Sequence, residues 1–98
     1  MEVLLLDTLY KVIEEEKEGF VKEEVESKFT EYFLDYDYVF GDWAYGKLRL
    51  KGFNKKGHPN FKEQNDIASL NTYKKDFCAP ECKNFLLEKK VKQRKSVA

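Results

Sequence analysis

The chain has 98 residues, of which 42% are hydrophobic, and this is enough for one domain with one core. No apolar stretch approaches the roughly 20 residues of a membrane-spanning helix, and the run Val3–Leu6 has neither a basic leader nor a small-residue cleavage site. Two cysteines do not make a disulfide framework. We therefore expect a cytoplasmic protein without a membrane segment, and exclude the disulfide-rich secreted class.

The net charge is zero, but the two halves of the chain carry opposite charge. Residues 1–42 contain 13 Asp and Glu against 4 Lys and Arg, whereas residues 43–98 contain 5 against 14. One interpretation is that the halves attract each other in the fold and expose solvated faces of both signs. The other is that the second half builds a basic surface for an anionic partner.

The N-terminal segment, residues 1–18, predicts two short strands. It contains β-branched and aromatic residues, and Leu6-Asp7-Thr8 is suited to the turn between them. The acidic stretch Glu14–Gly19 then reads as a solvated connector.

A helix is predicted over about residues 20–35. Apolar residues recur there at spacings of three and four, and Glu23 and Glu24 lie near the expected N-terminus, where the helix dipole favours acids. The apolar positions are Val21, Val25, Phe29, Tyr32, Phe33 and Tyr36. We interpret this stripe as core.

The next segment predicts a β-hairpin. Tyr38–Phe40 is β-branched and aromatic, and Lys47–Lys51 alternates strictly. The alternation places its two leucines on the core face and Arg49 and Lys51 on the other. We expect Asp42–Gly46 to form a wide aromatic loop between the strands.

The remaining elements are a polar loop, a short helix and a last strand. Residues 54–65 form the loop, and Asp66 is placed to cap a helix over about residues 66–77. Residues 84–88 suit a strand, and residues 89–98 read as a frayed basic tail.

Together these elements predict one α+β domain over residues 1–88. Its sheet is small and mainly antiparallel, with about four to five strands, and the longer helix packs on one face.

The hairpin segment resembles the YutD-like family, small uncharacterised cytosolic proteins of Gram-positive bacteria. The resemblance rests on Tyr36-Asp37-Tyr38, on Gly41-Asp42-Trp43, and on Tyr45-Gly46 followed by Leu48-Arg49-Leu50-Lys51-Gly52-Phe53. A second block follows, in which Tyr73, Cys78, Cys82 and Phe85 match.

The resemblance covers most of the chain up to about residue 88. It implies an α+β fold and a cytosolic location, and it brings no established activity, substrate or catalytic residue. Two positions depart from the family pattern. Ala44 stands where Gly is expected, and Val21 stands where an Asn cap is expected, so the first helix should begin poorly capped.

Cys78 and Cys82 are separated by three residues. A redox C-x-x-C motif has two intervening residues, and a structural zinc site needs four ligands. Three alternatives remain open: two packed thiols, a reversible disulfide, or part of a metal site. We expect no cofactor.

An enzyme is not favoured by the sequence. His58 is the only histidine and stands alone in a loop. Asp42 and Arg49 suit a carboxylate–guanidinium pair across the hairpin, which either fixes the loop or holds an arginine for an anionic ligand.

The function hypothesis is a small binding or regulatory module of unknown partner and oligomeric state. Its candidate surface is on the hairpin and consists of Asp42, Trp43, Tyr45, Arg49 and Lys51. An RNA-binding protein is the first alternative, because aromatic residues alternate with cations as on single-strand RNA platforms. A small enzyme or a metal or redox protein that uses Cys78 and Cys82 is the second.

Overall fold

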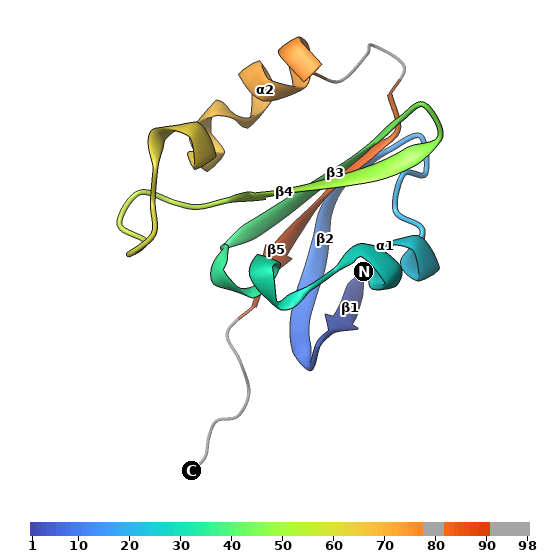
Figure 1. Cartoon of the computed structure of the whole chain (residues 1–98), viewed down its shortest axis with the longest axis horizontal. Helices are drawn as coiled ribbons and strands as arrows, with labels where there is room; N and C mark the ends of the chain where they lie inside the picture. Colours follow the sequence, from blue (N-terminus) through green and yellow to red (C-terminus); the bar gives the residue numbers. More distant parts are fainter. Residues whose placement is uncertain (78–81, 91–98) are drawn as a thin grey trace.

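A computed structural model describes residues 1–77 and 82–90 of the chain. Within this part, five strands form one antiparallel sheet (Figure 1). The strands are β1 (Glu2–Leu5), β2 (Thr8–Glu16), β3 (Tyr38–Ala44), β4 (Lys47–Phe53) and β5 (Asn84–Lys89). The predicted α+β class and number of strands are confirmed.

The order of strands is β1-β2-β5-β3-β4, so the last strand lies in the middle. β1 and β2 form one hairpin and β3 and β4 form another. β5 pairs with β2 on one side and with β3 on the other, and it joins the two hairpins into one sheet. The predicted last strand is therefore confirmed, with a central place that its sequence alone does not reveal.

Helices cover both faces of the sheet, as Figure 1 shows. On one face, α1 (Lys22–Lys28) supplies Val25 to a core that includes Tyr10, Val39 and Phe85. On the other face, α2 (Leu70–Phe77) supplies Leu70 to a core with Phe40, Phe53 and Leu86. Successive residues of a strand point to opposite faces. Because both faces are covered, residues 84–87 of β5 are all buried. This explains the apolar run over residues 85–87.

The helix predicted over residues 20–35 is two shorter segments. α1 ends at Lys28, Phe29 and Thr30 are extended, and a 3₁₀ helix, η1, follows over Glu31–Asp35. The break lets the Phe29 ring enter the core against Tyr10, with ring centroids 5.3 Å apart. A 3₁₀ helix repeats every three residues, so the apolar spacing does not distinguish it from an α-helix.

The predicted aromatic core stripe holds only in part. Val25 and Phe29 are buried, but Tyr32 is 62% exposed. The N-cap residue Val21 makes no side-chain capping hydrogen bond, as the departure from the family pattern predicts.

The second predicted helix, over residues 66–77, is confirmed. It begins as a 3₁₀ turn, η3 (Ile67–Ser69), and continues as α2. The Asp66 carboxylate accepts a hydrogen bond from the Ala68 backbone N–H at 2.9 Å, which is the expected cap. The short 3₁₀ helix η2 (Glu63–Asn65) precedes it.

Lys89 and Lys90, which the sequence assigns to the tail, make backbone hydrogen bonds to the domain. Lys89 N–H donates to Asp37 C=O and Lys90 N–H to Leu9 C=O, both at 2.9 Å. Residues 91–98 lie outside the described part.

Both hairpins turn on two residues in the left-handed region. The predicted turn between β1 and β2 is confirmed, with φ of 51° at Leu6 and 64° at Asp7. β2 continues to Glu16, so the first residues of the predicted acidic connector are in fact a strand.

The turn between β3 and β4 is Tyr45-Gly46, with φ of 55° and 75°. The wide aromatic loop predicted over residues 42–46 is therefore wrong, because β3 runs to Ala44.

Among the described residues, no helix is both long enough and apolar enough to cross a membrane.

Replacing Tyr10 by Phe should stabilise the protein. The Tyr10 hydroxyl is buried and makes no hydrogen bond in the described part, so its removal should raise the free energy of unfolding by about 1 kcal/mol in a urea titration at neutral pH. A variant less stable than the parent would contradict this assignment.

The same variant should flatten the loss of stability at alkaline pH. Burial raises the pKa of Tyr10 above its ordinary value of 10.0, so the unfolded chain releases this proton first. The titration of Tyr10 therefore leaves the free energy of unfolding unchanged below pH 10. Above pH 10 it lowers this free energy by up to about 1.4 kcal/mol per pH unit. Tyr10→Phe should fall less steeply; an equal slope would contradict the prediction.

Gly41→Ala should destabilise the sheet. Gly41 lies opposite Phe85, and an added Cβ would stand 2.1 Å from Cζ of that ring. We expect a loss of about 1–3 kcal/mol in the free energy of unfolding. Because the contact is with the ring, adding Phe85→Leu should reduce the cost of Gly41→Ala. Equal stability of Gly41→Ala and the parent would refute the packing described.

Candidate functional site

The tip of the β3–β4 hairpin presents Tyr45 to solvent. Positive φ at both turn residues is the signature of a type I′ turn, for which Asn-Gly is the favoured pair. Gly46 fits this rule, whereas Tyr45 adopts a conformation that costs an L residue about 1–2 kcal/mol. The Tyr45 side chain is 102% exposed, so no burial in the core offsets this cost.

Next to the tip, Asp42 and Arg49 form the predicted carboxylate–guanidinium pair. They are cross-strand partners in the register of β3 and β4. Arg49 Nε donates to Asp42 Oδ1 at 3.1 Å and Nη2 donates to Oδ2 at 2.6 Å, which is a two-pronged pair. The Asp42 side chain is 2% exposed and the Arg49 side chain 46%. A buried carboxylate thus holds a half-exposed guanidinium in a fixed orientation.

The Arg49 guanidinium also contacts α2. Its Nη2 donates to the Phe77 carbonyl at 3.1 Å, so the Nε and Nη2 hydrogens are engaged. The two Nη1 hydrogens have no partner in the described part of the chain. The hydrogen bond to Asp42 raises the pKa of Arg49, and the negative charge of Asp42 raises it further, against a smaller lowering by burial. Arg49 therefore stays charged and keeps two oriented donors.

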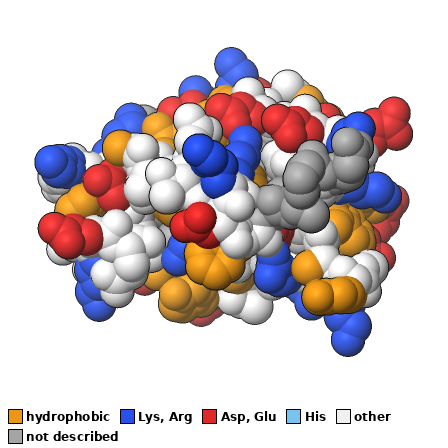
Figure 2. All heavy atoms as spheres, turned by 90° about the horizontal axis from the view of Figure 1, so that it is seen from above, with side chains coloured by type: hydrophobic (Ala, Val, Ile, Leu, Met, Phe, Trp, Pro, Cys, Tyr) orange, Lys and Arg blue, Asp and Glu red, His pale blue; other side chains and the backbone are white. Residues whose placement is uncertain are grey.

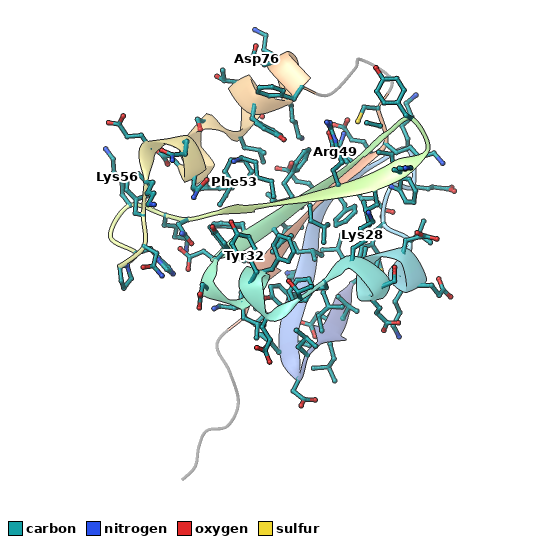
Figure 3. All side chains as sticks on the ribbon, in the orientation of Figure 1. Lys28, Tyr32, Arg49, Phe53, Lys56 and Asp76 are labelled. Atoms are coloured by element: carbon teal, nitrogen blue, oxygen red, sulfur yellow. The ribbon has the colours of Figure 1, made fainter. Side chains whose placement is uncertain are left out.

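Phe77 extends this surface and was not among the predicted site residues. It is 60% exposed, and its ring lies 4.8 Å from that of Tyr73 between centroids. Its helical spacing predicts burial, so no signal in the sequence marks it as exposed. We call Tyr45, Arg49 and Phe77 the hairpin–α2 surface. In Figure 3, Arg49 lies between β4 and α2.

Lys51 lies on the same face but is engaged within the fold. Its Nζ stands 5.3 Å from the centre of the Phe53 ring and 5.6 Å from that of Tyr73. It also donates to Asn65 Oδ1 at 3.3 Å. These contacts make Lys51 a link between β4, α2 and the preceding loop.

Trp43 lies on the opposite face of the sheet. Alternation along β3 turns its side chain toward α1, where it packs against the Val25 core. Its Nε1 donates to the Gly19 carbonyl at 2.8 Å, which ties the start of the α1 segment to β3. The five candidate residues are therefore divided by the sheet: Asp42, Arg49 and Lys51 on the α2 face, Trp43 on the α1 face and Tyr45 at the tip.

The two cysteines are only partly described. Cys82 Sγ lies 3.6 Å from the Trp43 carbonyl oxygen, and Cys78 lies outside the described residues. Among residues 1–77 and 82–90, no group of three or more His, Cys, Asp and Glu side chains is placed to hold a metal.

His58 does not join Asp42 and Arg49. Its Nδ1 accepts a hydrogen bond from the Asn60 N–H at 2.9 Å, within the loop that follows β4. In Figure 3, Lys56 of this loop lies at the end of β4 away from Arg49. No convergent catalytic group is built from these three side chains.

Comparison with known proteins identifies the family. A family model described as "Putative antitoxin YutD-like" matches residues 5–88. The Bacillus subtilis (strain 168) protein "Putative antitoxin YutD" is 30% identical over 87 residues, which are 89% of this chain and 96% of that protein. The solution NMR structure of yutD from B. subtilis matches with a TM-score of 0.79 and 29% identity, covering 94% of this chain and 84% of that chain. The resemblance seen in the sequence is thereby confirmed, and the chain belongs to the YutD-like family.

Proposed function

We propose that the protein is a binding module that recognises a protein partner through the hairpin–α2 surface. Tyr45, Arg49 and Phe77 make the contact, and Asp42 positions Arg49. Tyrosine and arginine are enriched among the residues that dominate protein–protein affinity. The other sequence candidates, Trp43 and Lys51, contribute by holding the sheet, the α1 segment and α2 in place.

The observation that carries this proposal is the exposure of Tyr45 in a left-handed backbone position. A side chain that contacts no core and sits in an unfavourable conformation does not stabilise the fold. Strained residues that persist at exposed positions are typical of functional sites. The strain at Tyr45 is explained if its ring is used against another molecule.

The chemistry of Arg49 suggests what the partner presents. The ion pair with Asp42 fixes the guanidinium before binding, so little side-chain entropy is lost on contact. Its two Nη1 hydrogens suit a carboxylate oxygen, while Tyr45 and Phe77 suit apolar or aromatic side chains. We expect an Asp or Glu next to an apolar residue at the partner's contact point.

The name of one relative also points to a partner molecule. The B. subtilis relative is called a putative antitoxin, and an antitoxin is a molecule that counteracts a toxin. A small domain that masks a toxin by direct contact would need a preorganised surface of this kind.

The RNA-binding alternative receives less support from the geometry. Two lysines of the α2 face are engaged within the fold: Lys51 with aromatic rings, and Lys74 with Glu14 at 3.3 Å. In the face that Figure 2 shows, basic side chains are interspersed with acidic and hydrophobic ones, without a continuous basic band. A phosphate backbone would have to compete with these contacts.

Tyr45→Asn separates the role in binding from the role in folding. Asparagine suits the left-handed turn, so the variant should be more stable by about 1 kcal/mol in a urea titration. The same variant should lose the partner because the aromatic ring is gone. A matched control is Glu18→Asn. Glu18 also has a φ of 55°, so this variant relieves the same kind of backbone strain elsewhere on the chain.

The binding measurement compares immobilised parent, Tyr45→Asn and Glu18→Asn proteins in a lysate of the organism that encodes the chain. The expected result is a protein captured by the parent and by Glu18→Asn, reduced at least about tenfold with Tyr45→Asn, and unaffected by nuclease. Loss of capture after nuclease treatment would instead support RNA. The same proteins captured by all three would overturn the proposed surface.

A further inference from the structure

The two edges of the sheet differ in chemistry. β4, at one edge, carries Lys47, Arg49 and Lys51 at alternate positions. β1, at the other, has Leu4 near its middle and a single charge, Glu2, at its start. Natural proteins protect an edge strand with charges, prolines or bulges, because its unpaired backbone groups bind other strands. β4 has this protection and β1 does not.

The backbone of β1 is oriented for pairing on its outer side. Val12 N–H donates to Met1 C=O, so the peptide groups of Met1 face β2. Because these groups alternate along an antiparallel strand, those of Glu2 and Leu4 point away from β2. The sheet formed by the described residues provides no strand to receive them.

The space beside β1 is open and largely apolar. A shallow hollow of about 620 Å³ lies there, bounded by residues of β1 and by the segment that leads into α1. Its lining residues are Met1, Glu2, Val3, Leu4, Leu9, Phe20 and Lys22. Met1 is 65% exposed, Leu4 62% and Leu6 49%. Leu6, like Tyr45, is an exposed residue in a left-handed turn position and is not used by the core.

We propose that β1 pairs antiparallel with β1 of a second copy of this chain, about a two-fold axis at Leu4. In this register Leu4 faces its own copy, and Val3 lies opposite Leu5 of the second copy. Val3 and Leu5 are both buried on the α1 face, so the pairing keeps the inner and outer faces of the two sheets continuous. Leu9, the cross-strand partner of Leu4, extends the apolar contact on the outer face.

Charge favours a second copy as the occupant. The chain has zero net charge, so two copies do not repel each other at long range. The hollow has one acid, Glu2, and one base, Lys22, at its rim. In a two-fold arrangement the rim of each copy faces the same two charges of the other copy, one negative and one positive.

The pairing leaves the proposed partner surface free. β1 and β4 are opposite edges of the sheet, so the dimer would present two hairpin–α2 surfaces at its outer ends. The inference does not depend on the proposed function, since it rests on other residues at another edge.

Sedimentation velocity of the purified protein over a range of concentrations tests this pairing. The parent should shift from monomer to dimer as concentration rises. Leu4→Lys places like charges against each other at the axis and should weaken the dimer by at least about tenfold. Ile13→Lys is the matched control, because Ile13 is 40% exposed on β2, away from the β1 edge, and its replacement should leave dimerisation unchanged.

Amide exchange provides a measurement that does not rely on a variant. The Leu4 N–H of the parent should become protected as the dimer forms, while circular dichroism checks that both variants fold. The proposal is overturned if the parent stays monomeric, if folded Leu4→Lys dimerises like the parent, if both variants lose dimerisation equally, or if an open-ended series of oligomers forms instead of a dimer.

Discussion

The fold depends on the central position of β5. The β1–β2 and β3–β4 hairpins pair with this strand and not with each other. Its residues 84–87 are buried on both faces, so the sheet is stable only when helices cover both sides. The last described strand in the sequence thus completes a sheet that the first 53 residues leave in two parts.

This arrangement also positions the candidate site. Pairing of β5 with β3 sets Asn84 opposite Asp42, and the hairpin register then sets Asp42 opposite Arg49. The same face receives α2, whose last residue contributes its carbonyl to Arg49. A guanidinium held by a buried acid and a helix end is rigid, and rigid polar groups bind at lower entropic cost. The core that stabilises the sheet therefore orients the proposed contact residues.

The sequence predicts the local features of this structure and misses the long-range ones. Strand alternation predicts that the leucines of β4 face the core, and Leu48 is buried while Leu50 packs against the same core. The predicted hairpin also brings Asp42 opposite Arg49, because the register of a hairpin is set locally by its turn. The central place of β5 arises from pairings distant in sequence, which no local pattern encodes. The sequence predicts Trp43 and Asp42 on one surface, because it indicates a strand only over residues 38–40. The alternation along the full β3 separates the two side chains.

Native-state hydrogen exchange tests most directly whether β5 joins the two hairpins into one cooperative unit. The slowest amides of β2, β3 and β5 should exchange with the same free energy and the same dependence on urea, both equal to those of global unfolding. If the β3–β4 hairpin keeps its protection while β2 and β5 exchange through a lower-energy opening, the hairpins fold independently and the central role of β5 is wrong.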